Sequence, residues 1–249
     1  MPLISLQIGD RIATLQLCRP AKRNALNREM FDELEQALSR LEEDLTTTVL
    51  LIRGDERAFS AGADLDEVKN LDEDGLRAWI QRGHHIFSSL AGLPQATIGA
   101  IRGYALGGGL ELALACDFRV ADENAVLGFP EVSNGWIPGW GGTTRLPQLV
   151  GKARAKQLVL LAERVSAREA LAMGLVHRVH PRAEFDSAVD RLARSLADKN
   201  PVAIREAKRI LSHTTSCDGS PAVLSEIEGS LRCFRALSEE KMVPAHGSA

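Results

Sequence analysis

The chain has 249 residues, of which 45% are hydrophobic and 25% are charged, and its formal net charge at pH 7 is −3. This balance is that of an ordinary globular protein with a sizeable core, and it excludes an intrinsically disordered chain. The slight negative charge provides no basic field that would attract nucleic acid or an anionic membrane.

Strands and helices alternate from the start of the chain. Residues 3–8 and 11–18 alternate apolar and polar side chains around Gly9-Asp10, a pattern that predicts a β-hairpin. Apolar residues at helical spacing predict a helix over 26–45, and the β-branched and apolar run 48–52 predicts a short buried strand. The chain therefore begins as a mixed α/β protein.

The same alternation continues through the middle of the chain. Helices are predicted at 64–71, at 74–90 and after Gly107, and strands at 97–101, 118–121 and 126–129. Strands that alternate with helices imply an α/β architecture with parallel pairing. The pattern alone does not choose between a doubly wound sheet and a less common arrangement.

The last third of the chain is predicted to be mostly helical. Ser166 is a good N-cap for a helix over 167–173, and Gly174 stands at the position after its end. Beyond residue 182 three further helices are predicted, at 183–197, 201–211 and 221–237, with a polar, glycine-containing hinge at 212–220. We therefore divide the chain into a core at 1–182 and a helical C-terminal region at 183–249.

Cysteines and termini indicate the compartment. The N-terminus lacks the basic and apolar regions of a secretory signal, and no stretch approaches the ~18 apolar residues of a membrane span. The four cysteines have no C-x-x-C spacing, so we expect reduced, mostly structural thiols. A soluble protein in the cytoplasm is the expectation.

Glu111 and Glu131 each lie beside a glycine-rich stretch. Glu111 follows Tyr104-Ala-Leu-Gly-Gly-Gly-Leu, and Glu131 ends Leu127-Gly-Phe-Pro-Glu. A third glycine turn lies in Ala58-Phe-Ser-Ala-Gly-Ala-Asp-Leu. Glycine lets backbone N–H groups approach a ligand closely, and two such groups aimed at one oxygen form an oxyanion hole. With two carboxyls nearby for proton transfer, this combination predicts an enzyme.

Six segments in this order resemble the crotonase (enoyl-CoA hydratase/isomerase) superfamily: 19–27, 58–65, 103–117, 129–147, 163–176 and 201–208. The resemblance covers nearly the whole chain. It implies a crotonase-like spiral of ββα repeats, followed by a C-terminal helical region through which subunits associate as trimers or dimers of trimers. It also implies an acyl-CoA enzyme of the kind used in fatty-acid β-oxidation.

The resemblance implies a specific chemistry, most like that of an enoyl-CoA hydratase. Water is added across a trans-2-enoyl-CoA to give a 3-hydroxyacyl-CoA, and the backbone N–H groups of Ala61 and Gly108 stabilise the enolate oxygen. Glu111 corresponds to the base that acts on water, and Glu131 to the proton donor. Gly139 falls where the family keeps its backbone close to the reacting water.

Coenzyme A contacts are implied in the same way. Lys22 and Arg23 correspond to contacts on the adenosine side, while solvated loop charges are the alternative for both. The other residues of this predicted CoA-binding turn are Ala25, Leu26, Ala63, Asp64 and Leu65. Asp64 is interpreted mainly as a structural carboxylate. For the acyl pocket the candidates are Trp136 and Trp140, with plain core or interface packing as the alternative.

No permanently bound cofactor is expected, because the substrate itself carries coenzyme A as a thioester. The histidine pairs 84–85 and 177/180 lack the spacing of a zinc site, so no metal is expected either. The segment that follows Lys241 departs from the family, whose members usually continue into a basic, Phe-containing helix that helps to close over CoA. The resemblance therefore does not fix CoA affinity, the contribution of a neighbouring subunit to the pocket, or the details of assembly.

Alternative functions stay open at this point. A Δ3–Δ2-enoyl-CoA isomerase needs only the second carboxylate, so it is the nearest competitor. Ser60 lies in a sequence one residue away from the G-x-S-x-G elbow of serine hydrolases, although no strand runs directly into it. A protein that only binds CoA or RNA is the non-catalytic alternative, and the absence of a basic stripe argues against it.

Overall fold

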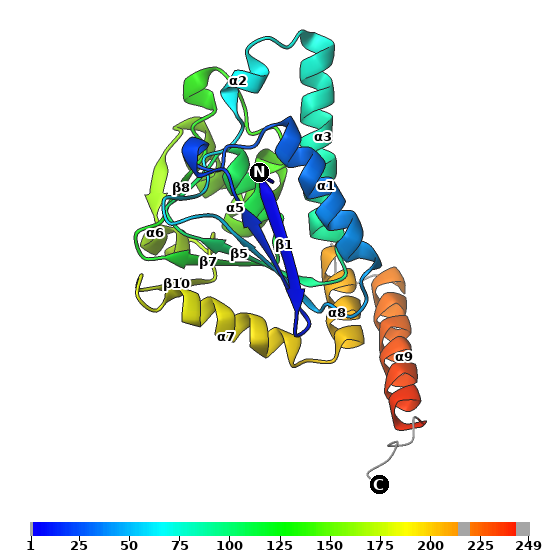
Figure 1. Cartoon of the computed structure of the whole chain (residues 1–249). Helices are drawn as coiled ribbons and strands as arrows, with labels where there is room; N and C mark the ends of the chain where they lie inside the picture. Colours follow the sequence, from blue (N-terminus) through cyan, green and yellow to red (C-terminus); the bar gives the residue numbers. More distant parts are fainter. Residues whose placement is uncertain (1, 214–219, 243–249) are drawn as a thin grey trace.

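Two β-sheets form the centre of the computed structural model, which describes residues 2–213 and 220–242 (Figure 1). The larger sheet has the order β1-β2-β3-β5-β7-β10, with strands β1 (Ile4–Gly9), β2 (Ile12–Leu17), β3 (Val49–Arg53), β5 (Ala96–Ile101), β7 (Phe118–Asp122) and β10 (Arg178–His180). The smaller has the order β4-β6-β8-β9, with strands β4 (Ala58–Ser60), β6 (Tyr104–Leu106), β8 (Val126–Gly128) and β9 (Arg164–Ser166).

The chain passes alternately between the two sheets. Strands β3, β5 and β7 pair in parallel in the larger sheet, and the strand that follows each of them, β4, β6 or β8, pairs in parallel in the smaller one. Helices then return the chain to the next turn. This repetition confirms the predicted spiral of ββα units, and the hairpin of β1 and β2 is antiparallel as predicted.

Apart from the helix at Gly142–Leu160, which was not predicted, the helices lie close to their predicted positions. They are α1 (Arg28–Glu43), α2 (Leu65–Val68), α3 (Glu73–Gly92), α4 (Gly108–Leu114), α5 (Gly142–Leu160), α6 (Ala167–Ala172), α7 (Phe185–Ala197), α8 (Pro201–His213) and α9 (Ser220–Met242), with 3-10 turns at Pro20–Lys22 and Val132–Asn134. Ser166 caps α6 in a capping box with Glu169, and Gly174 has φ +79° as expected.

Five helices and strands were not predicted, and one helix was predicted too long. Strands β4, β6, β9 and β10 have three residues each, too few to show a period. Helix α5 contains Pro147 and is kinked at Gly151, which hides its periodicity. The helix predicted at 64–71 covers only Leu65–Val68.

Helix α7 packs on the larger sheet. Phe185, Val189 and Leu192 form one buried cluster with Val49 and Ile98 of the strands, separate from the main core between the sheets and the other helices. The predicted C-terminal region thus begins with a helix that covers a core sheet (Figure 1). The division of the chain at residue 182 stays a prediction.

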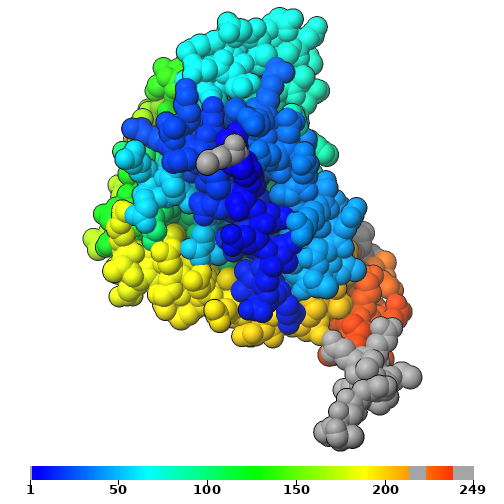
Figure 2. Space-filling model, in the orientation of Figure 1, coloured from blue at the N-terminus to red at the C-terminus, as the bar shows by residue number. Residues whose placement is uncertain are grey.

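Helices α8 and α9 lie side by side at one end of the molecule, and α9 extends away from the body (Figures 1 and 2). Lys208 fastens α8 to the core, because its Nζ lies 2.8 Å from Asp117 Oδ2 and 2.8 Å from the carbonyl oxygen of Gln95. The predicted hinge at 212–220 falls mainly on residues 214–219, outside the described residues. Within the described part of the chain, no helix has the length and apolarity to cross a membrane.

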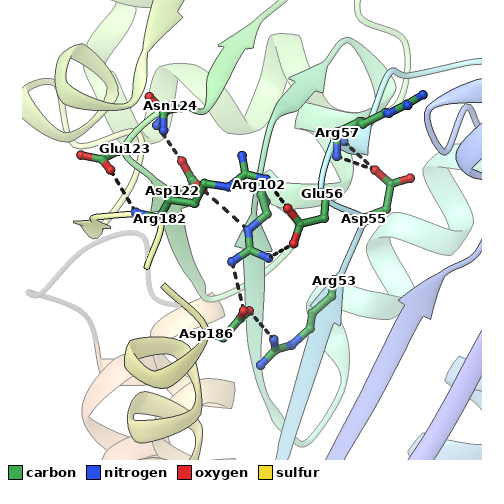
Figure 3. Close-up of polar contacts among 11 residues, drawn as sticks. Arg53, Asp55, Glu56, Arg57, Arg102, Asp122, Glu123, Asn124, Arg182 and Asp186 are labelled. Atoms are coloured by element: carbon green, nitrogen blue, oxygen red, sulfur yellow. Dashed lines mark hydrogen bonds and ion pairs between the residues drawn. The ribbon is translucent and has the colours of Figure 1, made fainter. Parts of the chain in front are cut away.

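A network of arginines and carboxylates gathers at the carboxyl ends of β3, β5 and β7 (Figure 3). Arg102 lies 3.0 Å from Glu56 Oε1, 3.0 Å from Asp186 Oδ2 and 3.6 Å, through Nε, from Asp122 Oδ2. Arg53 also pairs with Asp186, at 2.9 Å. The network joins α7 to the strand ends, and it places one cation, Arg102, beside Asp122, which is only 1% exposed.

Candidate active site

A cavity of about 400 Å³ lies where the turn after β4, the start of α4, helix α3 and the segment before α5 meet. Nine of the predicted site residues line it: Ala61, Ala63, Leu65, Gly108, Glu111, Glu131, Trp136, Gly139 and Trp140. The five predicted residues that do not line it are Lys22, Arg23, Ala25, Leu26 and Asp64. The fold therefore brings both glutamates and both glycine turns to one hollow.

The turn after β4 presents one unused backbone N–H group. The N–H of Ala61 donates to the carbonyl oxygen of Arg23 at 2.9 Å, and that of Gly62 donates to Ser60 Oγ at 3.2 Å. No described residue accepts a hydrogen bond from the N–H of Ala63. The assignment of Ala61 as an oxyanion-hole donor is therefore wrong, because its hydrogen already holds the neighbouring loop in place. The free donor is Ala63.

The second unused N–H group is that of Gly108, the first residue of α4. The N–H groups in a helix's first turn have no partner within the helix, and no described residue accepts from this one. A Cβ on Gly108 would stand 3.4 Å from the nitrogen of Ala63, and a Cβ on Gly62 would stand 3.2 Å from that of Gly108. Only glycines allow this approach, which brings the two free donors side by side.

Glu111 is held by backbone groups alone. It lies in the first turn of α4 with 2% of its surface exposed, and its Oε1 accepts hydrogen bonds from the N–H groups of Trp140 and Gly142, each at 2.7 Å. Burial raises the pKa of Glu111 to about 7, against the lowering effect of these two hydrogen bonds and of the charge of Arg145. A solvated surface carboxylate, the usual role of a glutamate in the first turn of a helix, is excluded by this burial.

Glu131 lies beside Gly107, the residue that precedes α4. A Cβ on Gly107, which has φ +51°, would stand 2.8 Å from Glu131 Oε1, so this glycine makes room for the carboxyl. Its Oε2 is buried and has no hydrogen-bond partner in the described structure. Burial is the main cause that raises the pKa of Glu131 to about 7, and the nearby charge of Glu111 raises it further.

The two glutamates therefore share one set of surroundings. Neither carboxyl forms an ion pair with any described residue, and both line the same cavity. A carboxyl that is buried without a cation keeps its proton to higher pH, and two close carboxyls titrate as a pair. Near neutral pH such a pair can both accept and donate a proton, which general acid–base catalysis requires.

Lys22 and Arg23 lie outside the cavity and are exposed. Lys22 Nζ is 2.9 Å from Asp66 Oδ2, and this contact raises the pKa of the lysine. Arg23 stacks over the ring of Tyr104 at 5.7 Å, with a left-handed backbone at φ 51°. The structure thus gives both side chains protein partners, and their predicted contact with CoA stays a prediction.

The rest of the predicted CoA-binding turn has a structural role in this fold. Leu26 is fully buried, donates its N–H to the carbonyl oxygen of Gly62 and accepts from the N–H of Asp64. Asp64 caps α2 and pairs with Arg19 at 2.7 Å, as its structural interpretation expects. Leu65, by contrast, is 52% exposed and lines the cavity, and Ala25 is nearly buried.

The two candidate tryptophans lie at different depths. Trp136 is 43% exposed, whereas Trp140 is 4% exposed and packs against the rings of Trp79, Phe31 and Phe87. Gly139 lines the cavity between them in sequence. Trp136 thus belongs to the rim and Trp140 to the wall.

Sequence reasoning missed one wall of the cavity. Four residues of α3 line it: Leu76, Trp79, Ile80 and His84. These residues stand at positions i, i+3, i+4 and i+8, which lie on one face of a helix. This pattern was the signal available in the sequence. Without knowing which neighbour that face meets, the pattern shows an amphipathic helix and no more.

The serine-hydrolase alternative does not fit the structure. Ser60 is fully buried, and its hydroxyl donates to the carbonyl oxygen of Asn24 at 2.8 Å while accepting from the N–H of Gly62. It holds two loops together and presents no oxygen to the cavity. Among the described residues, no three His, Cys, Asp or Glu side chains gather in a way that could hold a metal ion.

Known proteins are similar to this chain in sequence and in fold. A family model described as enoyl-CoA hydratase/isomerase matches residues 7–242. The short-chain-enoyl-CoA hydratase of Clostridium acetobutylicum is 34% identical, with 97% of this chain and 93% of the relative covered. The crotonyl-CoA hydratase of Syntrophomonas wolfei is 35% identical, with coverages of 97% and 94%.

Solved structures agree with the sequence relatives. The crystal structure of an enoyl-CoA hydratase from Bacillus anthracis superimposes with a TM-score of 0.90 at 36% identity, covering 94% of this chain and 91% of the other. The chain belongs to the enoyl-CoA hydratase/isomerase family of the crotonase superfamily.

Proposed function

We propose that this enzyme adds water across the double bond of a trans-2-enoyl-CoA to give a 3-hydroxyacyl-CoA, or catalyses the reverse. The observation that carries the proposal is the pair of carboxyls in one cavity: Glu111 is buried, Glu131 is half-buried with a buried Oε2, and neither has an ion-pair partner among the described residues. Hydration needs one group to take a proton from water and one to give a proton to C2. Two carboxyls with pKa near 7 suit both tasks.

The thioester oxygen is held by two backbone donors in this proposal. As water adds at C3, negative charge moves onto that oxygen, and the N–H groups of Ala63 and Gly108 stabilise it. Both groups are unused and lie on adjacent backbones. Loss of one such donor typically lowers the rate by about 10²–10³.

Glu111 acts on the water. Hydrogen bonds from Trp140 and Gly142 fix its Oε1, which leaves Oε2 to accept the water proton. Glu131 then supplies the proton that C2 receives, and its unpartnered Oε2 is suited to that transfer. Gly139 borders the place of this water, and a Cβ there would stand 3.8 Å from the carbonyl oxygen of Ile137 and from Ile80. The acyl group lies among Trp136, Trp140 and the α3 wall.

Coenzyme A approaches across the exposed edge of the turn. Lys22 and Arg23 interact with its phosphates or adenine, and Leu65 borders the path of the pantetheine, while the buried Leu26 supports this turn from within. The phosphate must compete with Asp66 for Lys22, because the two side chains are paired in the structure without CoA. We therefore expect the lysine to add little to affinity.

Assembly and location form a separate part of the proposal. The α8–α9 hairpin carries exposed apolar side chains, which include Leu211, Val223, Leu224, Ile227 and Leu231. Exposed apolar surface of this kind is typical of subunit interfaces, so a homotrimer or dimer of trimers is proposed. Action in the cytoplasm, on acyl-CoA intermediates of fatty-acid β-oxidation, is proposed with it.

A product analysis tests the reaction. The purified protein is incubated with short, medium, branched and aromatic trans-2-enoyl-CoA thioesters and with a trans-3-enoyl-CoA, and products are identified by mass spectrometry. Hydration predicts a gain of one water on the 2-enoyl substrates, abolished by Glu111→Gln. A shifted double bond without water, little affected by Glu111→Gln, would instead identify a Δ3–Δ2 isomerase.

A further inference from the structure

The indole of Trp140 is wedged between two glycines on different helices. A Cβ on Gly83 of α3 would stand 2.4 Å from both Cδ1 and Nε1 of Trp140. A Cβ on Gly108 of α4 would stand 2.3 Å from its Cζ3. Distances this short mean that no residue other than glycine fits at either position while the indole stays in place. The indole therefore occupies a notch formed by the missing side chains of Gly83 and Gly108, which we call the Gly83–Gly108 notch.

Three aromatic rings hold the indole in that notch from other directions. The ring of Phe31 is 5.1 Å away, that of Trp79 is 5.5 Å away and that of Phe87 is 5.7 Å away, all nearly edge-on. Edge-to-face contacts of this kind are favourable and fix the orientation of a ring. Because interiors are close-packed, Trp140 cannot swing aside to admit a longer ligand.

The position of the indole relative to the reacting atoms gives it a function. It touches Gly108, whose N–H is one of the two proposed oxyanion donors, and its own backbone N–H holds Glu111. An acyl chain that leaves the oxyanion hole meets the cavity wall formed by Trp140 and Trp79. The wall therefore stands close to the carbonyl end of the chain.

We propose that Trp140, seated in the Gly83–Gly108 notch, sets the maximum acyl-chain length that this enzyme accepts, and that its substrates are short-chain enoyl-CoA thioesters. This inference rests on the proposed function. Removal of the indole joins its volume to the cavity and extends the pocket toward Phe31 and Phe87. Trp140 is thus a specificity-determining residue, in addition to its contact with Glu111.

A chain-length profile tests this role. The values of kcat/KM are measured for trans-2-enoyl-CoA thioesters of four, eight and twelve carbons with wild type and Trp140→Ala. We expect the ratio of twelve-carbon to four-carbon kcat/KM to rise by at least about tenfold in the variant, since pocket methylenes discriminate by such factors. A parallel loss on all three substrates, with the ratio unchanged, would overturn the proposal.

Phe87→Leu is the matched structural control. Phe87 belongs to the same aromatic cluster but does not line the cavity. Its loss weakens the packing behind Trp140 while the wall itself stays in place. The three substrates should therefore be affected equally, and a changed length profile in this variant would show that packing, and not the indole wall, selects the chain.

Gly83 supplies a second, independent test. Gly83→Ala should lower four-carbon kcat/KM by at least about tenfold when Trp140 is present, because the added methyl pushes the indole toward Gly108. In the Trp140→Ala background the same change should be harmless, since alanine is the better helix former. Equal effects of Gly83→Ala in both backgrounds would contradict the notch.

Binding separates this inference from the reaction itself. Saturated acyl-CoA thioesters of the same three lengths have no double bond to hydrate, so their dissociation constants report the pocket alone. Trp140→Ala should tighten the twelve-carbon thioester relative to the four-carbon one by at least about tenfold. If wild type binds all three with equal affinity, the length limit is refuted, whatever reaction the enzyme catalyses.

Discussion

Two groups of carboxyls in this molecule, each with one fully buried member, have opposite surroundings. At the carboxyl ends of the larger sheet, Asp122 lies beside Arg102, within a network of several ion pairs (Figure 3). In the cavity, Glu111 and Glu131 have no ion-pair partner among the described residues. Burial is nearly complete for both Asp122 and Glu111, at 1% and 2% exposure.

The difference shows how one fold separates structural from catalytic acids. A carboxylate next to arginine is compensated and serves to join elements, here the strand ends and α7. A carboxyl held only by backbone N–H groups, or by nothing, retains its proton toward neutral pH. The cost of placing the glutamates in the cavity without an ion-pair partner is what leaves them able to exchange protons.

Removal of one acid from the cavity should have the largest effect on catalysis. Glu111→Gln should lower kcat for hydration by about 10²–10⁴, because general acid–base catalysis typically contributes that much. The amide keeps an oxygen for the N–H groups of Trp140 and Gly142, so the fold should persist. Steady-state hydration kinetics and circular dichroism measure the two effects.

Asp186→Asn is the matched control, since it also neutralises one carboxylate but does so in the network of Figure 3. Its kcat should stay within about twofold of wild type, because the residue lies outside the cavity. Comparable losses in the two variants would mean that general electrostatics, and not the position of Glu111, supports the rate.

In the network of Figure 3, a substitution should lower stability and leave kcat unchanged. Arg102→Met leaves Asp122 without its cation, and removal of one member of a buried pair costs about 3–5 kcal/mol of unfolding free energy. Urea unfolding followed by fluorescence measures that loss. The kcat of the remaining folded enzyme should be unchanged, and a large fall in kcat would show that the two regions are coupled.

The pH dependence of stability distinguishes the cavity glutamates directly. Their folded pKa values, about 7 each, lie above the ordinary value of 4.5, so the folded protein binds more protons between these limits and loses stability as pH rises through 7. Glu111→Gln should therefore match wild type at pH 5 but exceed it by about 1–3 kcal/mol at pH 8. Equal stabilities at both pH values would argue for an ionised, compensated Glu111.

The smallest effect is expected at the edge of the network. Arg182 is half exposed and pairs with Glu56, whose side chain is itself largely exposed. Arg182→Ala should cost less than about 1 kcal/mol, since exposed ion pairs contribute little. Chemical unfolding in low and high salt checks this value, and a cost near that of Arg102→Met would mean that the whole network acts as one unit.

The sequence predicted much of this arrangement, and its failures have physical causes. The helices at 26–45 and 74–90 were predictable because their apolar faces repeat over many turns, and Glu111 and Glu131 were found through the glycines beside them. Strands of three residues, such as β6, have no such period. Their pairing is decided by neighbours far away in the chain.

The choice between Ala61 and Ala63 shows the limit for the site itself. Both are small residues that flank Gly62, and the sequence does not say which N–H is consumed. That depends on the carbonyl oxygen of Arg23, which the fold brings to Ala61. The contact between Gly83 and Trp140 could not be predicted either, because a glycine inside a helix does not indicate which side chain packs against it.

Carbon-13 NMR measures directly at which pH Glu111 and Glu131 lose their protons. In protein labelled at the glutamate side-chain carboxyl carbons, the two signals lost in Glu111→Gln and Glu131→Gln are followed from pH 4 to pH 9. We predict that both titrate near pH 7, as a coupled pair, well above the exposed glutamates. Titration of both below about pH 5, as for ordinary carboxyls, would contradict the account.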